Sequence, residues 1–394
     1  MKLDINTYKL SDTGNFGRNS LIIGTAGIII SVIGYFVDST QFFYSYLTSF
    51  VFWITISLGG LFFVLLHHLA NAKWSNPSRR LTENVMIILP VMAIFFIPII
   101  FGIKELYHWS HEDIVAADHL LQKKTPYLNV TFFLVRTAGY FLVWFIFSTV
   151  LYKTSIRQDS EYTESRVRRF KKLSPPGMIL FALTATFASF DWLMSLDAHW
   201  YSTIFGVYIF SGSFLAILSF IILIALYLRS NGILLNVITT KHFNDLGRLL
   251  FTFVIFWAYI TFSQYFLIWY ANIPEETVWF IHRWNGSWKY ISMIIIFGHF
   301  IIPFFVLITA AAKKNLKILA GTSIWLLVMH WIDIYWIVMP NFHEVCVRIS
   351  WMDFSTMVGI GGFFVWFFWR RLLSHSLIPV NDPSIKESLN ESHK

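Results

Sequence analysis

The chain has 394 residues, of which 56% are hydrophobic, 19% aromatic and only 13% charged. A soluble domain is typically about 25% charged, so this composition excludes an ordinary soluble enzyme. The single cysteine, Cys346, excludes an intrachain disulfide, a cysteine-ligated iron–sulfur cluster and a thiolate zinc site. We therefore expect a membrane protein that binds no redox cofactor of its own.

Ten apolar segments follow one another along the chain, each about as long as the roughly twenty residues that cross a bilayer as a helix. They cover residues 20–37, 46–69, 85–103, 128–152, 177–194, 203–228, 247–270, 289–310, 317–338 and 354–373. Backbone polar groups cannot face lipid unpaired, and no segment alternates like a barrel strand, so each is predicted to be a helix. The sequence thus predicts an all-α, polytopic integral membrane protein with ten transmembrane helices.

Basic residues predict the orientation of these helices, because cytoplasmic loops collect Lys and Arg. Both tails and the connections after spans two, four, six and eight hold twenty-three of them, and the other connections hold six. Both termini are therefore expected in the cytoplasm, and the net charge of +8 is expected to serve topology and contact with anionic lipid, with no nucleic-acid partner. The expected parts are a cytoplasmic amino tail (1–19), a ten-helix transmembrane domain (20–373) and a frayed cytoplasmic carboxyl tail (374–394).

Three prolines inside the spans, Pro90 and Pro98 in span three and Pro303 in span eight, are expected to kink their helices. Pro98 and Pro303 lie at similar depths in spans three and eight. Spans two to five and six to nine could therefore form two comparable groups of four helices, although no residue string repeats.

Polar residues within the spans are the candidates for function, because they are costly in hydrocarbon. The candidates for a proton path or for binding a quinol head group are Arg136, Asp191, Gln264, His299, His330 and Asp333. His330 and Asp333 lie one turn apart, and Arg136, Asp191 and this pair all fall in the outer half of their spans. We predict that these four residues form one outer polar site.

Each candidate also has a structural interpretation. Arg136 and Asp191 could form an ion pair that only holds two helices together. His299 could be a hydrogen-bonded core residue. The connection 104–127 is rich in His and acids, but its spacing matches no helical zinc motif, so an amphipathic surface helix that contacts a partner is preferred to a metal site. Haem b between two histidine-bearing helices is likewise not favoured, because no histidines pair at matched depth.

Two long strings resemble a known family. They are SFDWLMSLDAHWYSTIFGVYIFSGS at 189–213 and LGRLLFTFVIFWAYITFSQYFLIWYANIPEETVWFIHRW at 246–284. Both closely resemble the second ten-span membrane subunit of bacterial alternative complex III, a quinol:cytochrome c (or high-potential acceptor) oxidoreductase. More distantly, the chain is similar to the membrane subunits of polysulfide reductase and formate-dependent nitrite reductase complexes. Asp191 and Gln264 fall inside these strings, whereas Arg136, His299, His330 and Asp333 do not.

The resemblance implies two four-helix bundles with two flanking helices, in the bacterial inner membrane. The partners that it implies are a sister ten-span subunit, a periplasmic iron–sulfur subunit, cytochrome c subunits and a terminal oxidase. Haem c and iron–sulfur clusters would lie in those partners, and quinol (menaquinol or ubiquinol) would be the ligand.

The sequence therefore predicts a membrane subunit of a respiratory quinol-oxidising complex that contributes proton handling, assembly and quinol binding. Two alternatives stay open, a proton-coupled secondary transporter and a pure scaffold subunit of the same complex.

Overall fold

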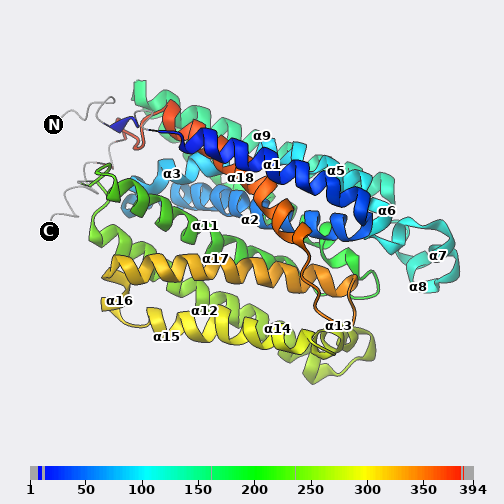
Figure 1. Ribbon diagram of the computed structural model, residues 1–394. Helices are drawn as coiled ribbons and strands as arrows, with labels where there is room; N and C mark the ends of the chain where they lie inside the picture. Colours follow the sequence, from blue (N-terminus) through cyan, green and yellow to red (C-terminus); the bar gives the residue numbers. More distant parts are fainter. Residues whose placement is uncertain (1–7, 11–13, 161, 236, 383–384, 386–394) are drawn as a thin grey trace.

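The computed structural model describes residues 8–10, 14–160, 162–235, 237–382 and 385. In this part of the chain the only β-structure is a single bridge between Lys9 and Ser376. Ten helices of the described residues, some of them broken, are long and apolar enough to cross a membrane. They lie roughly side by side (Figure 1). The predicted ten-span, all-α architecture is confirmed.

Eight of the spans are single helices or nearly so. These are α1 (Phe16–Val37), α2 (Ser39–Ala70), α9 (Val130–Ser160), α10 (Glu164–Trp192), α11 (Phe205–Ser230), α12 (Thr240–Ala271), α17 (Leu316–Val338) and α18 (Trp351–Ser374). Span three is broken into α3 (Asn76–Met86), α4 (Leu89–Phe95), α5 (Ile97–Phe101) and α6 (Ile103–Leu106). Span eight consists of α14 (Trp288–Ile294), a π-helix (Ile295–Ile301) and α15 (Ile302–Leu307). Short helices α7 (Glu112–Ala117), α8 (His119–Lys124), α13 (Pro274–Trp284) and α16 (Ala310–Lys314) lie in the connections.

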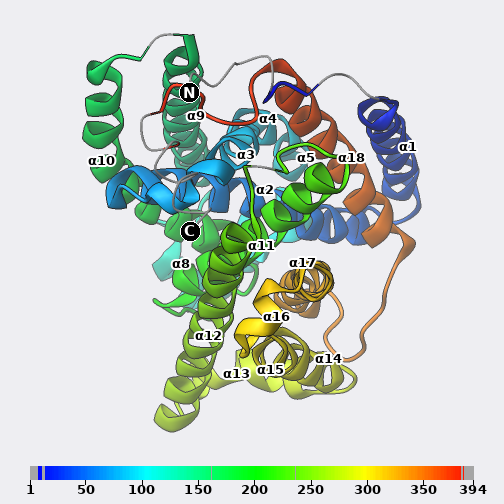
Figure 2. The same cartoon turned by 90° about the vertical axis from the view of Figure 1, so that its left-hand side faces the viewer.

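The spans form two four-helix bundles and a flanking pair (Figure 2). In the first bundle α2 packs against α3 and α10, and α9 packs against α10 and α4. In the second, α11 packs against α12 and α17, and span eight packs against α12 and α17. Contacts of α2 with α11 and α17 join the two bundles, and α18 rests on α2 with α1 outside it.

Glycines allow α1 and α18 to approach closely. A Cβ atom at Gly27 would lie 2.5 Å from the backbone nitrogen of Gly359, and one at Gly362 would lie 2.4 Å from Gly24. Backbone contact of this kind replaces the hydrophobic effect as the source of helix association in lipid.

The breaks in spans three and eight coincide with the predicted prolines. Helix α4 begins just before Pro90, α5 just before Pro98 and α15 just before Pro303. A proline has no N–H to give to the preceding turn, and at each of these three prolines the regular helix is interrupted. Pro175 and Pro176, by contrast, lie inside the continuous helix α10.

Two segments differ from the sequence prediction. Span three was expected to begin at 85, but α3 begins at Asn76, and all of its residues are buried although the segment reads NPSRRLTENVM. The carboxyl tail after Ser374 was expected to be frayed, yet Leu377, Ile378 and Val380 are buried. Arg79 of α3 pairs with Asp382 of the tail, and Arg80 pairs with Asp159 of α9, so charges that hydropathy treats as exposed are satisfied inside the protein. Residues 386–394 of that tail lie outside the described residues.

The described residues nearest both chain ends lie at one end of the bundle (Figure 1), as an even number of spans requires. We call this the tail end, and it includes Lys9, Ser376 and the turn between α2 and α3. The opposite end, with α7, α8 and α13, is the loop end.

Candidate functional site

The first buried carboxylate, Asp191, is held in an ion pair near the loop end of α10. Arg136 of α9 donates from Nε to Oδ2 at 2.8 Å and from Nη2 to Oδ1 at 2.9 Å, which is the two-point geometry that binds carboxylates most strongly. The hydroxyl of Tyr140 donates to Oδ2 at 2.6 Å. Asp191 is fully buried.

The guanidinium of Arg136 is itself enclosed. Its Nη1 donates to the carbonyl of Tyr127 at 2.8 Å, and its Cζ lies 3.8 Å from the centre of the Tyr127 ring and 4.3 Å from that of Phe132. Stacking on aromatic faces suits arginine where water is excluded. Every charged atom of this pair thus has a partner, which is the pattern of a structural ion pair.

The second buried carboxylate, Asp333 of α17, lies in the core of the second bundle and has different partners. The hydroxyl of Tyr208 on α11 donates to Oδ1, and Nε1 of Trp257 on α12 donates to Oδ2 at 3.2 Å. Both donors are neutral. Nδ1 of His299 lies 3.9 Å from Oδ2, too far for a hydrogen bond but close enough to attract if the ring is protonated. No Lys or Arg pairs with Asp333 within the described residues.

His299 sits in the π-helix that precedes Pro303, and it is fully buried. Its ring lies against that of Trp257 with 4.0 Å between centroids. Neither ring nitrogen has a hydrogen-bond partner in the described chain. A π-helix places one extra residue in a turn, and such turns recur at functional sites.

His330 contacts α2 instead. Its Nε2 lies 2.9 Å from Oγ1 of Thr55, and that hydroxyl already donates to the carbonyl of Phe52. In the neutral ring Nε2 therefore carries the hydrogen and donates to Thr55, and Nδ1 has no hydrogen and can only accept a hydrogen bond. Nδ1 has no partner among the described residues. Gly212 of α11 lies beside this ring, and a Cβ there would be 3.0 Å from Nδ1.

The structure thus divides the four predicted residues between two groups. Arg136 pairs with Asp191 between α9 and α10, and Asp333 lies with His299 and near His330 in the second bundle. No hydrogen bond or ion pair among the described residues joins the two groups, and α2 stands between them (Figure 2). Gln264 is buried on α12, seven residues beyond Trp257 and hence on the same helix face.

A polar crevice of about 240 Å³ opens at the loop end of the second bundle. Its lining includes Asp197, His199, His282, Arg283 and Glu344. Arg283 of α13 donates to the carbonyls of Trp336 at 3.1 Å and Ile337 at 2.8 Å, one turn beyond Asp333 on α17. Burial lowers the pKa of Arg283 to about 9. His199 and Asp118, which also line the crevice, are joined by a hydrogen bond of 2.6 Å between Nε2 and Oδ2, and this hydrogen bond lowers the pKa of the Asp118 carboxyl.

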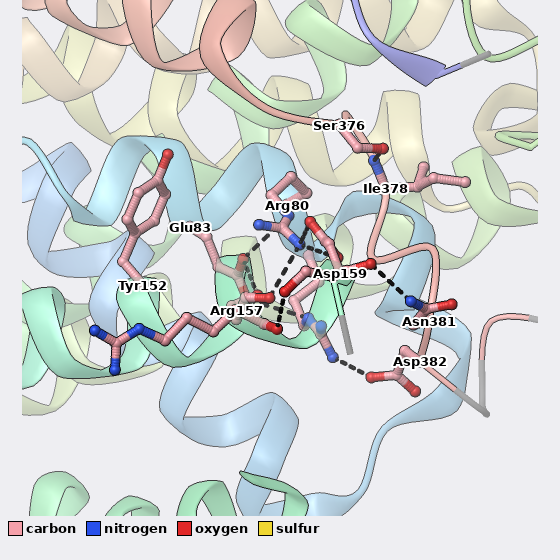
Figure 3. A network of polar contacts seen from close by, with 12 residues as sticks. Arg80, Glu83, Tyr152, Arg157, Asp159, Ser376, Ile378, Asn381 and Asp382 are labelled. Atoms are coloured by element: carbon pink, nitrogen blue, oxygen red, sulfur yellow. Dashed lines mark hydrogen bonds and ion pairs between the residues drawn. The ribbon is translucent and has the colours of Figure 1, made fainter. Parts of the chain in front are cut away.

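A further cluster of charged residues at the tail end was missed from the sequence (Figure 3). Arg80 donates from Nη2 to both oxygens of Asp159, at 2.8 and 2.7 Å, and its Nε faces Glu83 at 3.4 Å. Arg79 pairs with Glu83 at 3.1 Å and with Asp382 at 2.6 Å. The i, i+4 spacing of Arg79 and Glu83, in a segment read from the sequence as a connection between spans, was the one signal that could have indicated a helix there.

No group of three or more His, Cys, Asp or Glu side chains in the described ranges is arranged to hold a metal ion. The histidine-rich connection instead forms α7 and α8, where Asp118 caps α8 by accepting from the backbone of Leu120 and Leu121.

Fold and site together define a polytopic membrane protein of two four-helix bundles, with Asp191 buried in the first bundle and Asp333 in the second. No protein-family model matches the chain, and a search of curated proteins finds no similar sequence.

Proposed function

We propose that this chain is a membrane subunit of a respiratory quinol:cytochrome c (or high-potential acceptor) oxidoreductase complex, in which it handles protons. The observation that carries the proposal is the Asp333 carboxylate, buried with neutral donors and a histidine at 3.9 Å instead of a fixed counter-ion. The resemblance of the strings 189–213 and 246–284 to the second ten-span subunit of alternative complex III supplies the kind of complex.

The environment of Asp333 suits a group that gains and loses a proton. An isolated carboxylate is expensive to bury, and proton uptake removes that charge. His299 has two unpaired nitrogens and lies beside Asp333, so a proton can be exchanged between carboxylate and imidazole after a small movement. Asp191 is less suited to proton exchange, because its protonation would break the two-point ion pair with Arg136.

The crevice at the loop end supports a proton route that leads from Asp333 toward that end. Arg283 binds the carbonyls one turn beyond Asp333, and beyond it His199, His282 and Asp197 line the crevice. Quinol oxidation releases two electrons and two protons. The electrons would pass to haem c and iron–sulfur centres in partner subunits at this end, and the chain's own residues would hold and release the protons.

The proposal includes the setting of the complex. The chain would lie in the bacterial inner membrane with the tail end in the cytoplasm, beside a sister ten-span subunit. A periplasmic iron–sulfur subunit would cover the loop end, where α7, α8 and α13 project.

A proton-coupled secondary transporter is the second candidate, and the π-helix next to Asp333 favours it. Transporters build their sites from interrupted helices at mid-membrane. Such a carrier would act without redox partners.

Purification from native membranes in mild detergent separates the two. A respiratory subunit should migrate in a complex with the absorption bands of haem c and the paramagnetic signals of iron–sulfur centres, and that complex should reduce cytochrome c with added quinol. A chain that purifies alone and moves a solute with protons in vesicles would contradict the respiratory assignment.

A further inference from the structure

A polar pocket of about 190 Å³ lies at the tail end of the first bundle, and neither Asp191 nor Asp333 lines it. It forms where α2 ends, α3 begins, α9 ends and α10 begins. Its lining includes His68, Lys73, Arg79, Gln158, Lys171 and Asp382. The pocket is smaller than the roughly 300–1,000 Å³ of sites for drug-sized ligands, so it suits a small head group rather than a whole cofactor.

Three residues that line this pocket carry buried polar atoms with no hydrogen-bond partner in the part of the chain that the structure describes. The atoms are Nε and Nη2 of Arg79, Nε2 of His68 and Oε1 of Gln158. Arg79 and Gln158 are only 1% and 2% exposed. Buried polar atoms are nearly always paired, and leaving one unpaired costs about 1–3 kcal/mol. A ligand that met two donors and one acceptor here would remove that cost.

The side chains that carry these atoms are held in place by other contacts. Nη1 of Arg79 donates to Asp382 at 2.6 Å, and its Nε lies 3.1 Å from Glu83 in an ion pair, so Nη2 is the nitrogen that makes neither of these contacts. The ring of His68 stacks on Phe170 with 4.1 Å between centroids and 8° between planes. These contacts hold the donors before any ligand binds, which lowers the entropy cost of binding.

Charge at the pocket favours an anion. Three cationic side chains, Lys73, Arg79 and Lys171, line it against one carboxylate, Asp382. Lys171 belongs to the basic run at the start of α10, where that helix reaches the membrane surface. Lipid phosphates lie at this depth, and basic pockets between helices are known to bind anionic head groups.

We propose that this pocket binds the phosphodiester head group of an anionic phospholipid whose head carries a hydroxyl, such as phosphatidylglycerol. The phosphate oxygens accept from Nη2 of Arg79, Nε2 of His68 and the ammonium of Lys171. The hydroxyl of the head group donates to Oε1 of Gln158. The lipid would thereby fasten the ends of α2, α9 and α10 around α3. This inference is independent of the proposed redox function.

The test is lipid binding to the purified protein in detergent, measured by native mass spectrometry and by thermal unfolding. The probes are phosphatidylglycerol, phosphatidylcholine with the same acyl chains, and inorganic phosphate. Phosphatidylglycerol should bind at least tenfold more tightly than either of the others and should raise the unfolding midpoint most.

Two variants test the pocket itself. His68→Phe keeps the stack on Phe170 but removes Nε2, and it should weaken phosphatidylglycerol binding about fivefold, as expected for one lost hydrogen bond. Lys171→Gln changes an exposed residue with little risk to folding and should weaken binding by a similar factor. Lys172→Gln is the matched control, because it removes the same charge from the same helix outside the pocket, and it should change binding less than twofold.

Equal weakening by Lys171→Gln and Lys172→Gln would show that only general surface charge attracts the lipid. Equal binding of phosphatidylcholine and phosphatidylglycerol, or tight binding of free phosphate alone, would also overturn the proposal.

Discussion

The carboxylates of Asp191 and Asp333 are both fully enclosed, but their surroundings make them chemically different. Asp191 faces a guanidinium through two hydrogen bonds, and Asp333 faces a phenol, an indole and a histidine. A buried ion pair resists the loss of either member, because the remaining charge is stranded. The ion pair of Arg136 and Asp191 therefore holds two helices of the first bundle together, whereas Asp333 of the second bundle is suited to proton exchange.

The ion pair of Arg136 and Asp191 leads to a prediction about the free energy of unfolding. Asp191→Asn or Arg136→Met alone should destabilise the protein by about 3–5 kcal/mol, because each leaves a buried charge unpaired. The double variant Arg136→Met/Asp191→Asn should lose less than either single variant, since it removes both charges together. Thermal unfolding of the four proteins in detergent measures this. Additive losses in the double variant would mean that the two side chains do not act as a pair.

At the scale of helices, the sequence predicted what depends on continuous apolar length and missed what depends on contacts between distant segments. All ten spans and the breaks at Pro90, Pro98 and Pro303 follow from local rules. The start of span three did not, because α3 is polar and becomes a buried helix only when Asp159 and Asp382 pair with its arginines.

The candidate site shows the same limit. Depth in the membrane picked out Asp333, His299 and His330, but depth carries no information about which helix face meets which. Only the packing of α11 and α12 around α17 brings Tyr208 and Trp257 to Asp333 and leaves Asp191 in the other bundle.

Helix packing yields a second prediction, at the contact of α1 with α18. Gly27→Ala should destabilise the protein by about 1–3 kcal/mol, because its Cβ would lie 2.5 Å from the backbone of Gly359. Gly321→Ala on α17 is the control, since no atom lies within 4 Å of a Cβ there, and it should be neutral or slightly stabilising. The comparison is made by thermal unfolding in detergent. A neutral Gly27→Ala would show that the two helices separate readily.

Taken as a whole, the molecule has two chemically different ends. The tail end combines the basic loops with the Arg79 and Arg80 network, and the loop end presents histidines and acids around a crevice. The excess of Lys and Arg at the tail end predicts that it faces the cytoplasm.

The single cysteine allows this orientation to be tested without engineering the loop end. Cys346 is exposed in the connection between α17 and α18. A membrane-impermeant maleimide should label it in intact spheroplasts. In a Cys346→Ser background, Lys394→Cys should be labelled only after permeabilisation. The reverse pattern at both positions would invert the topology and place the crevice in the cytoplasm.

If Asp333 handles protons for quinol oxidation, as we propose, Asp333→Asn in the intact complex should impair turnover or proton release without preventing assembly. Asparagine nearly preserves shape and can still accept from Tyr208, so assembly should be normal. Proton transfer by a positioned group typically contributes about 10²–10⁴-fold, so quinol-dependent cytochrome c reduction or its coupled proton release should fall at least tenfold.

Asp353→Asn is the control in the same assay. Asp353 is a buried carboxylate that caps α18 and bonds Ser45 and the backbone of Ser350, so turnover per assembled complex should not change. We expect an assembled but slow or uncoupled Asp333→Asn complex and an unaffected Asp353→Asn complex. Normal assembly of Asp333→Asn with unchanged turnover and unchanged proton stoichiometry would show that Asp333 does not handle these protons.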